Sequence, residues 1–270
     1  MAGTPIALTI AGSDSGGGAG IQADLKAFSA NGAYGASVVT AITAQNTKEV
    51  SAVHAVPVDI VSAQIKAVLD DLDVDAIKIG MLFSPELIEA VAQGLAGFTG
   101  PIILDPVMVA KSGDALLQSE AVAGLIDQML PLATVLTPNL PEAALLLDQP
   151  PAKTDAEAVA QGQALLTMGP RAVLLKGGHA EGDTCTDFLL TADAPPFALP
   201  APRVQTQNTH GTGCTYSASI AALMAKGLDL PTAVQQAHSY LHQAILQADT
   251  LQIGSGHGPV HHFHAHWTNL

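Results

Sequence analysis

The chain has 270 residues, of which 48% are hydrophobic and 13% charged, and this composition favours a large packed core over disorder. Lys and Arg number 10 against 24 Asp and Glu, a formal net charge of -14 with no basic cluster, so we expect no nucleic-acid partner. No apolar run reaches the roughly 18 residues of a membrane span, so no membrane partner is expected either. The N-terminus lacks the pattern of a signal peptide, and two cysteines make no disulfide framework. We therefore expect a soluble cytoplasmic protein.

Short β-branched runs alternate with longer amphipathic runs along the chain. In order, they predict strands at 6–11, 36–43, 76–81, 101–107, 134–138 and 172–178. Helices are predicted at 21–30, 57–70, 84–95, 141–147, 155–168, 213–226 and 231–248. Residues 186–207 hold short runs broken by prolines, which predicts antiparallel strands at one sheet edge. Strands spaced by helices predict a mostly parallel sheet covered on both faces, in one α/β domain over residues 1–270.

Polar and glycine-rich residues follow several of the predicted strands, where ligands bind in such sheets. The run GSDSGGGAG (12–20) fits neither common phosphate-loop pattern and is either a tight turn or a ligand contact. Asp24, on the next helix, is either a carboxylate favoured by the helix dipole or a ligand contact. Gln45 and Asn46 follow the second strand, and a carboxamide there suits the edge of an aminopyrimidine, although a plain polar turn is the alternative.

Acidic and basic groups end three later strands. Asp105 precedes a proline that holds it extended, and Asn139 and Glu142 open a short helix. Such oxygen ligands suit Mg²⁺, whereas the alternative for Asn139 and Glu142 is a helix-capping box. Lys176 in KGGH ends another strand and is suited to neutralise a phosphate.

The loop NTHGTGC leads into a predicted helix and looks like an anion site. The backbone of Gly211, Thr212 and Gly213 can turn several N–H groups toward one point at the positive end of that helix. The same field is expected to lower the pKa of Cys214, whose thiolate would then accept a substrate hydroxyl proton. Cys185 has no such setting and is interpreted as structural.

The tail HGPVHHFHAHW (257–267) holds five of the ten histidines. Because Phe263 and Trp267 interleave them, we expect a packed C-terminal segment, with adventitious metal binding as the alternative.

Together, GSDSGGGAGIQADLKAF, AQNT, KIGML, LDPVMVAKSG, LTPNLPEA, LKGGH and NTHGTGC resemble the hydroxymethylpyrimidine/phosphomethylpyrimidine kinases of thiamine biosynthesis, in the ribokinase-like superfamily. The likeness runs from about residue 6 to the C-terminus, so the histidine tail is expected to be native. It implies a three-layer α/β/α sandwich, ATP with Mg²⁺, and a homodimer. It also implies two phosphorylations, of 4-amino-5-hydroxymethyl-2-methylpyrimidine and then of its monophosphate.

The resemblance also implies roles for individual residues. Gln45 would hydrogen-bond the pyrimidine, in a pocket lined by Gly12, Asp24 and Met81. Asn139 and Glu142 would serve ATP and magnesium, Lys176 the phosphates, and the backbone of residues 211–213 the anion hole. Cys214 stands where most ribokinase-like enzymes have an aspartate base.

Two alternatives stay open at this point. A pyridoxal or pyridoxine kinase of the same superfamily also phosphorylates a small heterocycle with a hydroxymethyl group. A non-catalytic sensor could bind thiamine precursors on the same scaffold, although Cys214, Lys176 and Glu142 together argue for catalysis.

Overall fold

The computed structural model describes residues 3–108, 119–179 and 182–267. Within these ranges nine strands form one sheet, in the order β3-β2-β1-β4-β5-β6-β7-β8-β9. The central strands are parallel: β1 (Ile6–Asp14), β2 (Tyr34–Gln45), β4 (Ala76–Ile79), β5 (Ile102–Leu104), β6 (Val135–Leu136) and β7 (Ala172–Leu175). Antiparallel strands border them: β3 (Val50–Ala55) at one edge, and β8 (Thr184–Thr191) and β9 (Ala194–Pro202) at the other.

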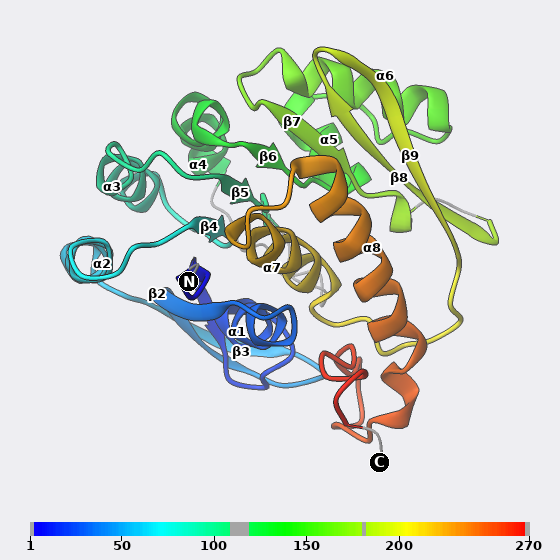
Figure 1. The fold of residues 1–270 in the computed structure, drawn as a ribbon, viewed down its shortest axis with the longest axis horizontal. Coiled ribbons are helices and arrows are strands. Elements are labelled where there is room, and N and C mark those ends of the chain that lie inside the picture. Colours follow the sequence, from blue (N-terminus) through cyan, green and yellow to red (C-terminus); the bar gives the residue numbers. More distant parts are fainter. Residues whose placement is uncertain (1–2, 109–118, 180–181, 268–270) are drawn as a thin grey trace.

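Helices cover both faces of the sheet (Figure 1). One face carries α2 (Val58–Leu69), α3 (Pro85–Gly94), α4 (Ser119–Gly124), α5 (Leu140–Leu147) and α6 (Asp155–Leu166). The other carries α1 (Gly20–Ala30), α7 (Thr212–Ala225) and α8 (Leu230–Leu246). Shorter helical turns are η1 (Leu125–Met129), η2 (Leu130–Leu132), η3 (Gly177–His179) and η4 (Ala248–Thr250). The expected three-layer α/β/α sandwich is confirmed.

The central strands are apolar because both of their faces are buried. In β1, the side chains of Leu8 and Ile10 belong to the core shared with α2 and α3, and Ala7 belongs to the core shared with α1 and α7. Successive side chains of the strand thus pack into the cores on opposite faces of the sheet, which explains why the sequence of this strand is continuously hydrophobic.

The structure differs from the predicted elements in three places. Strand β3 was not predicted, because residues 51–55 are exposed and lack the alternation of a half-buried strand. Helix α4 lies where no helix was predicted. Strand β7 was predicted to run to residue 178 but ends at Leu175, and the turn η3 follows it. Gly177 in this turn lies so close to β8 that a Cβ there would be 2.0 Å from Thr186 O.

The carboxyl ends of the parallel strands meet at one edge of the sheet, and the functional side chains gather there. Asp14 and Gln45 end β1 and β2, while Asp105 and Lys176 follow β5 and β7 directly. Over the part of the chain that the structure describes, none of the helices is both long and apolar enough to cross a membrane.

Candidate active site

A cavity of about 540 Å³ opens at this edge of the sheet. The predicted site residues that line it are Gly12, Gln45, Met81, Asp105, Asn139, Glu142, Lys176, Gly211, Thr212, Gly213 and Cys214. Seven separate segments of the chain therefore supply these residues to one cavity. Residues 109–113 of the motif LDPVMVAKSG lie outside the described residues.

Gly12 and Met81 shape one wall of the cavity. A Cβ on Gly12 would lie 2.5 Å from Met81 Cε, so only glycine leaves room for that methyl group. Met81 is buried, and its carbonyl accepts a hydrogen bond from Thr40 Oγ1 at 3.0 Å. This wall is apolar, which suits the face of a flat ring.

Residues 211–213 turn the backbone into the start of α7. Gly211 is the N-cap, with φ of 78°, and a Cβ there would lie 1.9 Å from Gly18 O. Glycine is therefore required both for the left-handed conformation and for the close approach. Residues 211–214, at the start of this 14-residue helix, line the cavity, and a helix start of this kind favours an anion.

Cys214 lines the cavity from the first turn of α7 and is half-buried. Burial raises the pKa of its thiol to about 11, which the Lys78 charge and a hydrogen bond with the Gly20 backbone only partly offset. The expectation that the helix field lowers this pKa is wrong. Loss of water destabilises the thiolate more than the helix dipole and the Lys78 charge stabilise it. At neutral pH Cys214 is a thiol.

Lys176 lies among carboxylates beside the anion loop. Its Nζ is 2.8 Å from Asp105 Oδ1 and 4.0 Å from Glu142 Oε2. A Cβ on Gly213 would lie 3.3 Å from Lys176 Nζ and 3.4 Å from Asp105 Oδ2, so loop, cation and carboxylate converge on one point.

The two carboxylates differ in their proton affinity. Burial raises the pKa of Asp105, but attraction to Lys176 and Lys78 outweighs it, and the pKa lies below its ordinary value. Burial raises the pKa of Glu142 to about 7, because attraction to Lys176 lowers it by less than the loss of water raises it, and Asp105 adds a smaller increase. Of the two carboxylates, Glu142 therefore keeps its proton to the higher pH.

Asn139 and Glu142 form a capping box at the start of α5 and also line the cavity. Asn139 Oδ1 accepts from Glu142 N and Glu142 Oε2 accepts from Asn139 N, both at 2.8 Å. The two interpretations of this pair are therefore compatible, because the cap orients both side chains at the cavity wall.

Asp24 is the one predicted site residue that the structure does not place on the cavity wall. Its carboxylate is fully buried, pairs with Lys78 and accepts a hydrogen bond from Thr9 Oγ1 at 2.6 Å. Sequence reasoning missed Lys78, which does line the cavity. The sequence signal that could have indicated Lys78 is its place as a charged residue inside the apolar run AIKIGM.

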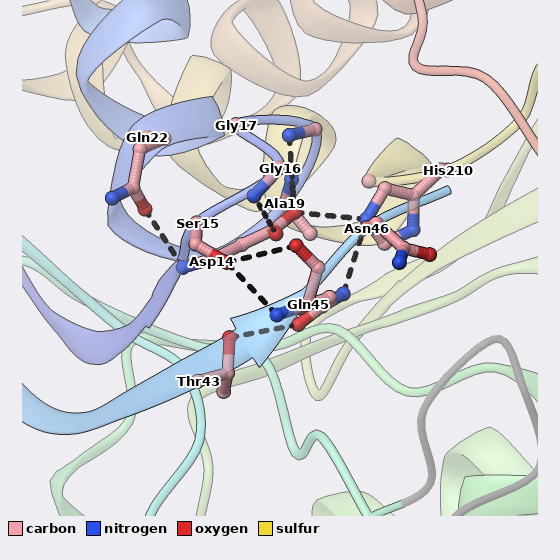
Figure 2. A network of polar contacts seen from close by, with 12 residues as sticks. Asp14, Ser15, Gly16, Gly17, Ala19, Gln22, Thr43, Gln45, Asn46 and His210 are labelled. Carbon is pink, nitrogen blue, oxygen red and sulfur yellow. Dashed lines mark hydrogen bonds and ion pairs between the residues drawn. The ribbon is translucent and has the colours of Figure 1, made fainter. Parts of the chain in front are cut away.

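Sequence reasoning also missed His210, whose position directly before GTGC was the signal. Figure 2 shows the side chains of Asp14, Gln45 and His210 pointing toward one another. His210 Nε2 lies 2.9 Å from Asp14 Oδ2 and 3.3 Å from Gln45 Nε2. Asp14 also accepts hydrogen bonds from the backbone N–H groups of Gly16, Gly18 and Ala19. The network joins the loop after β1, the end of β2 and the loop before α7.

The histidine-rich C-terminal segment is packed, as expected. It lies beside the end of α8 (red in Figure 1), where His261 N donates to Ala244 O. His262 is buried, and its Nε2 lies 2.9 Å from Thr215 Oγ1 in the first turn of α7. No group of three or more His, Cys, Asp or Glu placed to hold a metal is found in residues 3–108, 119–179 and 182–267.

Cys185 is half-buried and is not among the cavity residues.

The family model and a highly similar relative agree on one family. The family model described as phosphomethylpyrimidine kinase matches residues 14–261. A hydroxymethylpyrimidine/phosphomethylpyrimidine kinase of Rhizobium meliloti is 59% identical over 264 residues, covering 98% of this chain and 99% of the relative.

Two solved structures are also similar. The phosphomethylpyrimidine kinase of Clostridium difficile is 42% identical, with a TM-score of 0.78 over 89% of this chain and 99% of that one. The pyridoxal kinase of Staphylococcus aureus in complex with AMP-PCP and pyridoxal is 30% identical, with a TM-score of 0.90 over 99% of this chain and 97% of that one.

Proposed function

The chain belongs to the phosphomethylpyrimidine kinase family, and we propose that the cavity at the sheet edge is its active site. The chain is a kinase of thiamine biosynthesis that phosphorylates hydroxymethylpyrimidine to its monophosphate and then to the diphosphate, with ATP as donor. One observation carries the site assignment: the start of α7, Lys176 and Asp105 converge on one point of a cavity whose wall also holds Gln45. Residues 1–270 would then be one kinase domain, as the single sheet supports.

The pyrimidine ring would lie against the apolar wall of Gly12 and Met81, with its polar edge on Gln45. The carboxamide of Gln45 can give one hydrogen bond and accept another, as an amino group beside a ring nitrogen requires. Asp24 would not contact the ring. It would instead hold in place Lys78, which lines the cavity.

The phosphates of ATP would lie between the start of α7 and Lys176. The backbone N–H groups at the start of α7 would hold the transferring group, and Lys176 would neutralise it. In the first reaction the substrate hydroxyl oxygen attacks the γ-phosphorus while the bond to the β-phosphate oxygen breaks and ADP leaves, and the hydroxyl proton passes to an oxygen of the transferred phosphoryl group. Because Cys214 is protonated, its role in that step would be to orient the hydroxyl rather than to act as a preformed thiolate.

Asp105, Glu142 and Asn139 fit a magnesium site. Both carboxylates and the Asn139 side chain line the same cavity, which gives oxygen donors of the kind that Mg²⁺ prefers. With so few protein ligands, Mg²⁺ would keep several waters and bind the phosphates. When bound, the ion would neutralise charge on the phosphates of ATP.

A homodimer is a separate proposal, supported by exposed apolar side chains on the antiparallel pair of strands β2 and β3. Residues 51–55 of β3 are exposed, and Ile42 and Val53 are each about half exposed. Light scattering coupled to gel filtration would give twice the mass of the 27.5 kDa chain if the proposal is right.

Parallel steady-state assays test the function. Purified protein with ATP and Mg²⁺ is given hydroxymethylpyrimidine, phosphomethylpyrimidine or pyridoxal, and ADP is measured. We expect turnover of both pyrimidines, with kcat/KM above that for pyridoxal. The likeness to the pyridoxal kinase makes pyridoxal the second candidate, and a tenfold preference for it would overturn the assignment. Binding of a pyrimidine with no ADP release from any of the three substrates would favour the sensor interpretation.

A further inference from the structure

Hydrogen-bond chemistry decides which way the carboxamide of Gln45 faces. Gln45 Oε1 lies 3.1 Å from Thr43 Oγ1, and Thr43 also lies 2.8 Å from Ser13 O. A hydroxyl has one hydrogen, which Thr43 gives to the carbonyl of Ser13, an acceptor only. Thr43 is therefore left as an acceptor toward Gln45, and an acceptor needs the amide nitrogen opposite it.

Asp14 determines the proton on His210. Oδ2 of Asp14 accepts from Gly18 N at 3.0 Å and from Ala19 N at 2.8 Å, and it lies 2.9 Å from His210 Nε2. A carboxylate that accepts backbone amides in this way is ionised and offers lone pairs only, so His210 Nε2 carries the hydrogen. That single hydrogen points mainly at Asp14, and the longer contact of 3.3 Å to the Gln45 carboxamide can only share it in a three-centre bond. A protonated Nε2 has no lone pair to accept an amide N–H, so the amide oxygen is the group favoured opposite it.

We propose that His210, held by Asp14, turns the Gln45 carboxamide so that its oxygen faces His210 and its nitrogen faces Thr43, which sets the direction in which the pyrimidine ring binds. The amide nitrogen then donates to Thr43, and the amide oxygen shares the His210 Nε2–H with Asp14, whereas the opposite orientation sets donor against donor and acceptor against acceptor. The proposal rests on the proposed function and deepens it. His210 is a specificity-determining positioning residue that acts through Gln45.

The direction matters because the substrate edge is asymmetric. In this orientation the free lone pair of Gln45 Oε1 lies on the His210 side and the free N–H on the Thr43 side. A 4-aminopyrimidine matches this order when its amino group lies toward His210 and its ring nitrogen toward Thr43. The hydroxymethyl carbon is attached next to the amino-bearing carbon, on the side away from that nitrogen. The alcohol thus lies toward residues 211–214, which follow His210 directly.

Glycines in both loops allow His210 to reach Asp14. A Cβ on Gly18 would lie 2.4 Å from His210 Cδ2, and one on Gly211 would lie 1.9 Å from Gly18 O. The histidine ring therefore fits against the loop after β1 only because position 18 has no side chain. Gly18→Ala displaces the ring without removing it, which gives a second variant with a different chemical change.

The test compares the aminopyrimidine with an analogue that carries hydrogen in place of the amino group. His210→Leu removes the donor, and His210→Gln replaces it with another N–H of similar reach. We expect kcat/KM for the aminopyrimidine to fall about tenfold or more in His210→Leu, while kcat/KM for the analogue and KM for ATP change little. His210→Gln recovers most of the loss, and Gly18→Ala shows the same selective fall. His266→Leu, at an exposed position, is the matched control and behaves as wild type.

Each remaining result counts against the proposal. An equal fall for both substrates means that His210 only supports the loops. A His210→Gln variant no better than His210→Leu means that the donor is irrelevant. Wild-type protein that does not phosphorylate the aminopyrimidine overturns the proposed function itself, whereas an unselective variant of an active wild type overturns only the role of His210.

Discussion

Lys78 Nζ lies 2.8 Å from Asp24 Oδ2 at the floor of the cavity, and neither side chain has exposed surface. Burial alone lowers the pKa of Lys78, but attraction to Asp24 outweighs it, and the pKa lies above its ordinary range. Thr9 Oγ1 adds a hydrogen bond to the same carboxylate. Two charges are therefore tolerated inside the sandwich because each neutralises the other.

Removing one partner of this pair should strongly destabilise the protein. Asp24→Leu leaves the Lys78 ammonium buried without a counter-charge, and we expect the free energy of unfolding to fall by about 3–5 kcal/mol. The double variant Asp24→Leu/Lys78→Met should recover most of it. Urea denaturation at pH 7 measures both. The control is Asp70→Ala in the exposed Lys66–Asp70 pair, which should cost less than about 1 kcal/mol. A single variant no worse than this control would contradict the ion-pair interpretation.

Cys214 should matter more for the first phosphorylation than for the second. The first nucleophile is a neutral alcohol that must be oriented and lose a proton, whereas the second is a phosphate oxygen that is already ionised. Cys214→Ala should lower kcat with hydroxymethylpyrimidine about 10²-fold and leave kcat with phosphomethylpyrimidine within about threefold. Separate assays started from each substrate give the two values, with Cys185→Ala as control. Equal losses in both steps would show that the thiol instead supports the phosphate site.

The parallel sheet and its edge could be predicted from sequence because each signal was local. Leu8 and Ile10 sit in an unbroken apolar run, and the glycines of residues 211–213 mark a turn into a helix. Strand β3 could not be predicted in this way. The side chains of its residues 51–55 are exposed, so they show no apolar pattern, and the strand forms only by pairing with β2.

Within the site, the residues that sequence reasoning missed or misplaced depend on long-range contacts. Asp24 and Lys78 are 54 residues apart, and Asp14 and His210 are 196 apart. Spacing along the chain carries no sign of such pairs. The pKa of Cys214 was misjudged for a related reason: a helix start is visible in sequence, whereas the burial that opposes it is not.

Gly12→Ala should selectively weaken pyrimidine binding. The new methyl group would lie 2.5 Å from Met81 Cε, and the flexible end of Met81 would have to move within the cavity. We expect KM for hydroxymethylpyrimidine to rise about tenfold while KM for ATP is unchanged, because a one-methyl misfit in an apolar pocket is worth about a factor of ten or more. Gly97→Ala, where a Cβ meets nothing within 4 Å, is the matched control. A rise in KM for ATP alone would place the pyrimidine elsewhere.

His262 should make the protein lose stability in acid. Thr215 Oγ1 lies 2.7 Å from Gly211 O, to which it donates, so His262 Nε2 must donate to Thr215, as a neutral imidazole can. Burial lowers the pKa of His262 to about 3 from its ordinary 6.5, with smaller contributions from Lys26 and neighbouring histidines. Below pH 6.5 the unfolded chain binds a proton here that the folded chain does not. Stability that is complete above pH 6.5 is therefore lost progressively as the pH falls toward 3.

Urea denaturation at pH 8 and pH 5 measures this contribution. Each pH unit below 6.5 costs about 1.4 kcal/mol, so His262 alone should lower the free energy of unfolding by about 2 kcal/mol at pH 5. His262→Gln keeps an N–H for Thr215 and does not titrate, so its loss between the two pH values should be smaller by that amount. His266→Gln changes an exposed histidine and should keep the wild-type loss. If His262→Gln also keeps it, His262 is protonated in the folded protein, and the hydrogen bond to Thr215 survives with a charged ring.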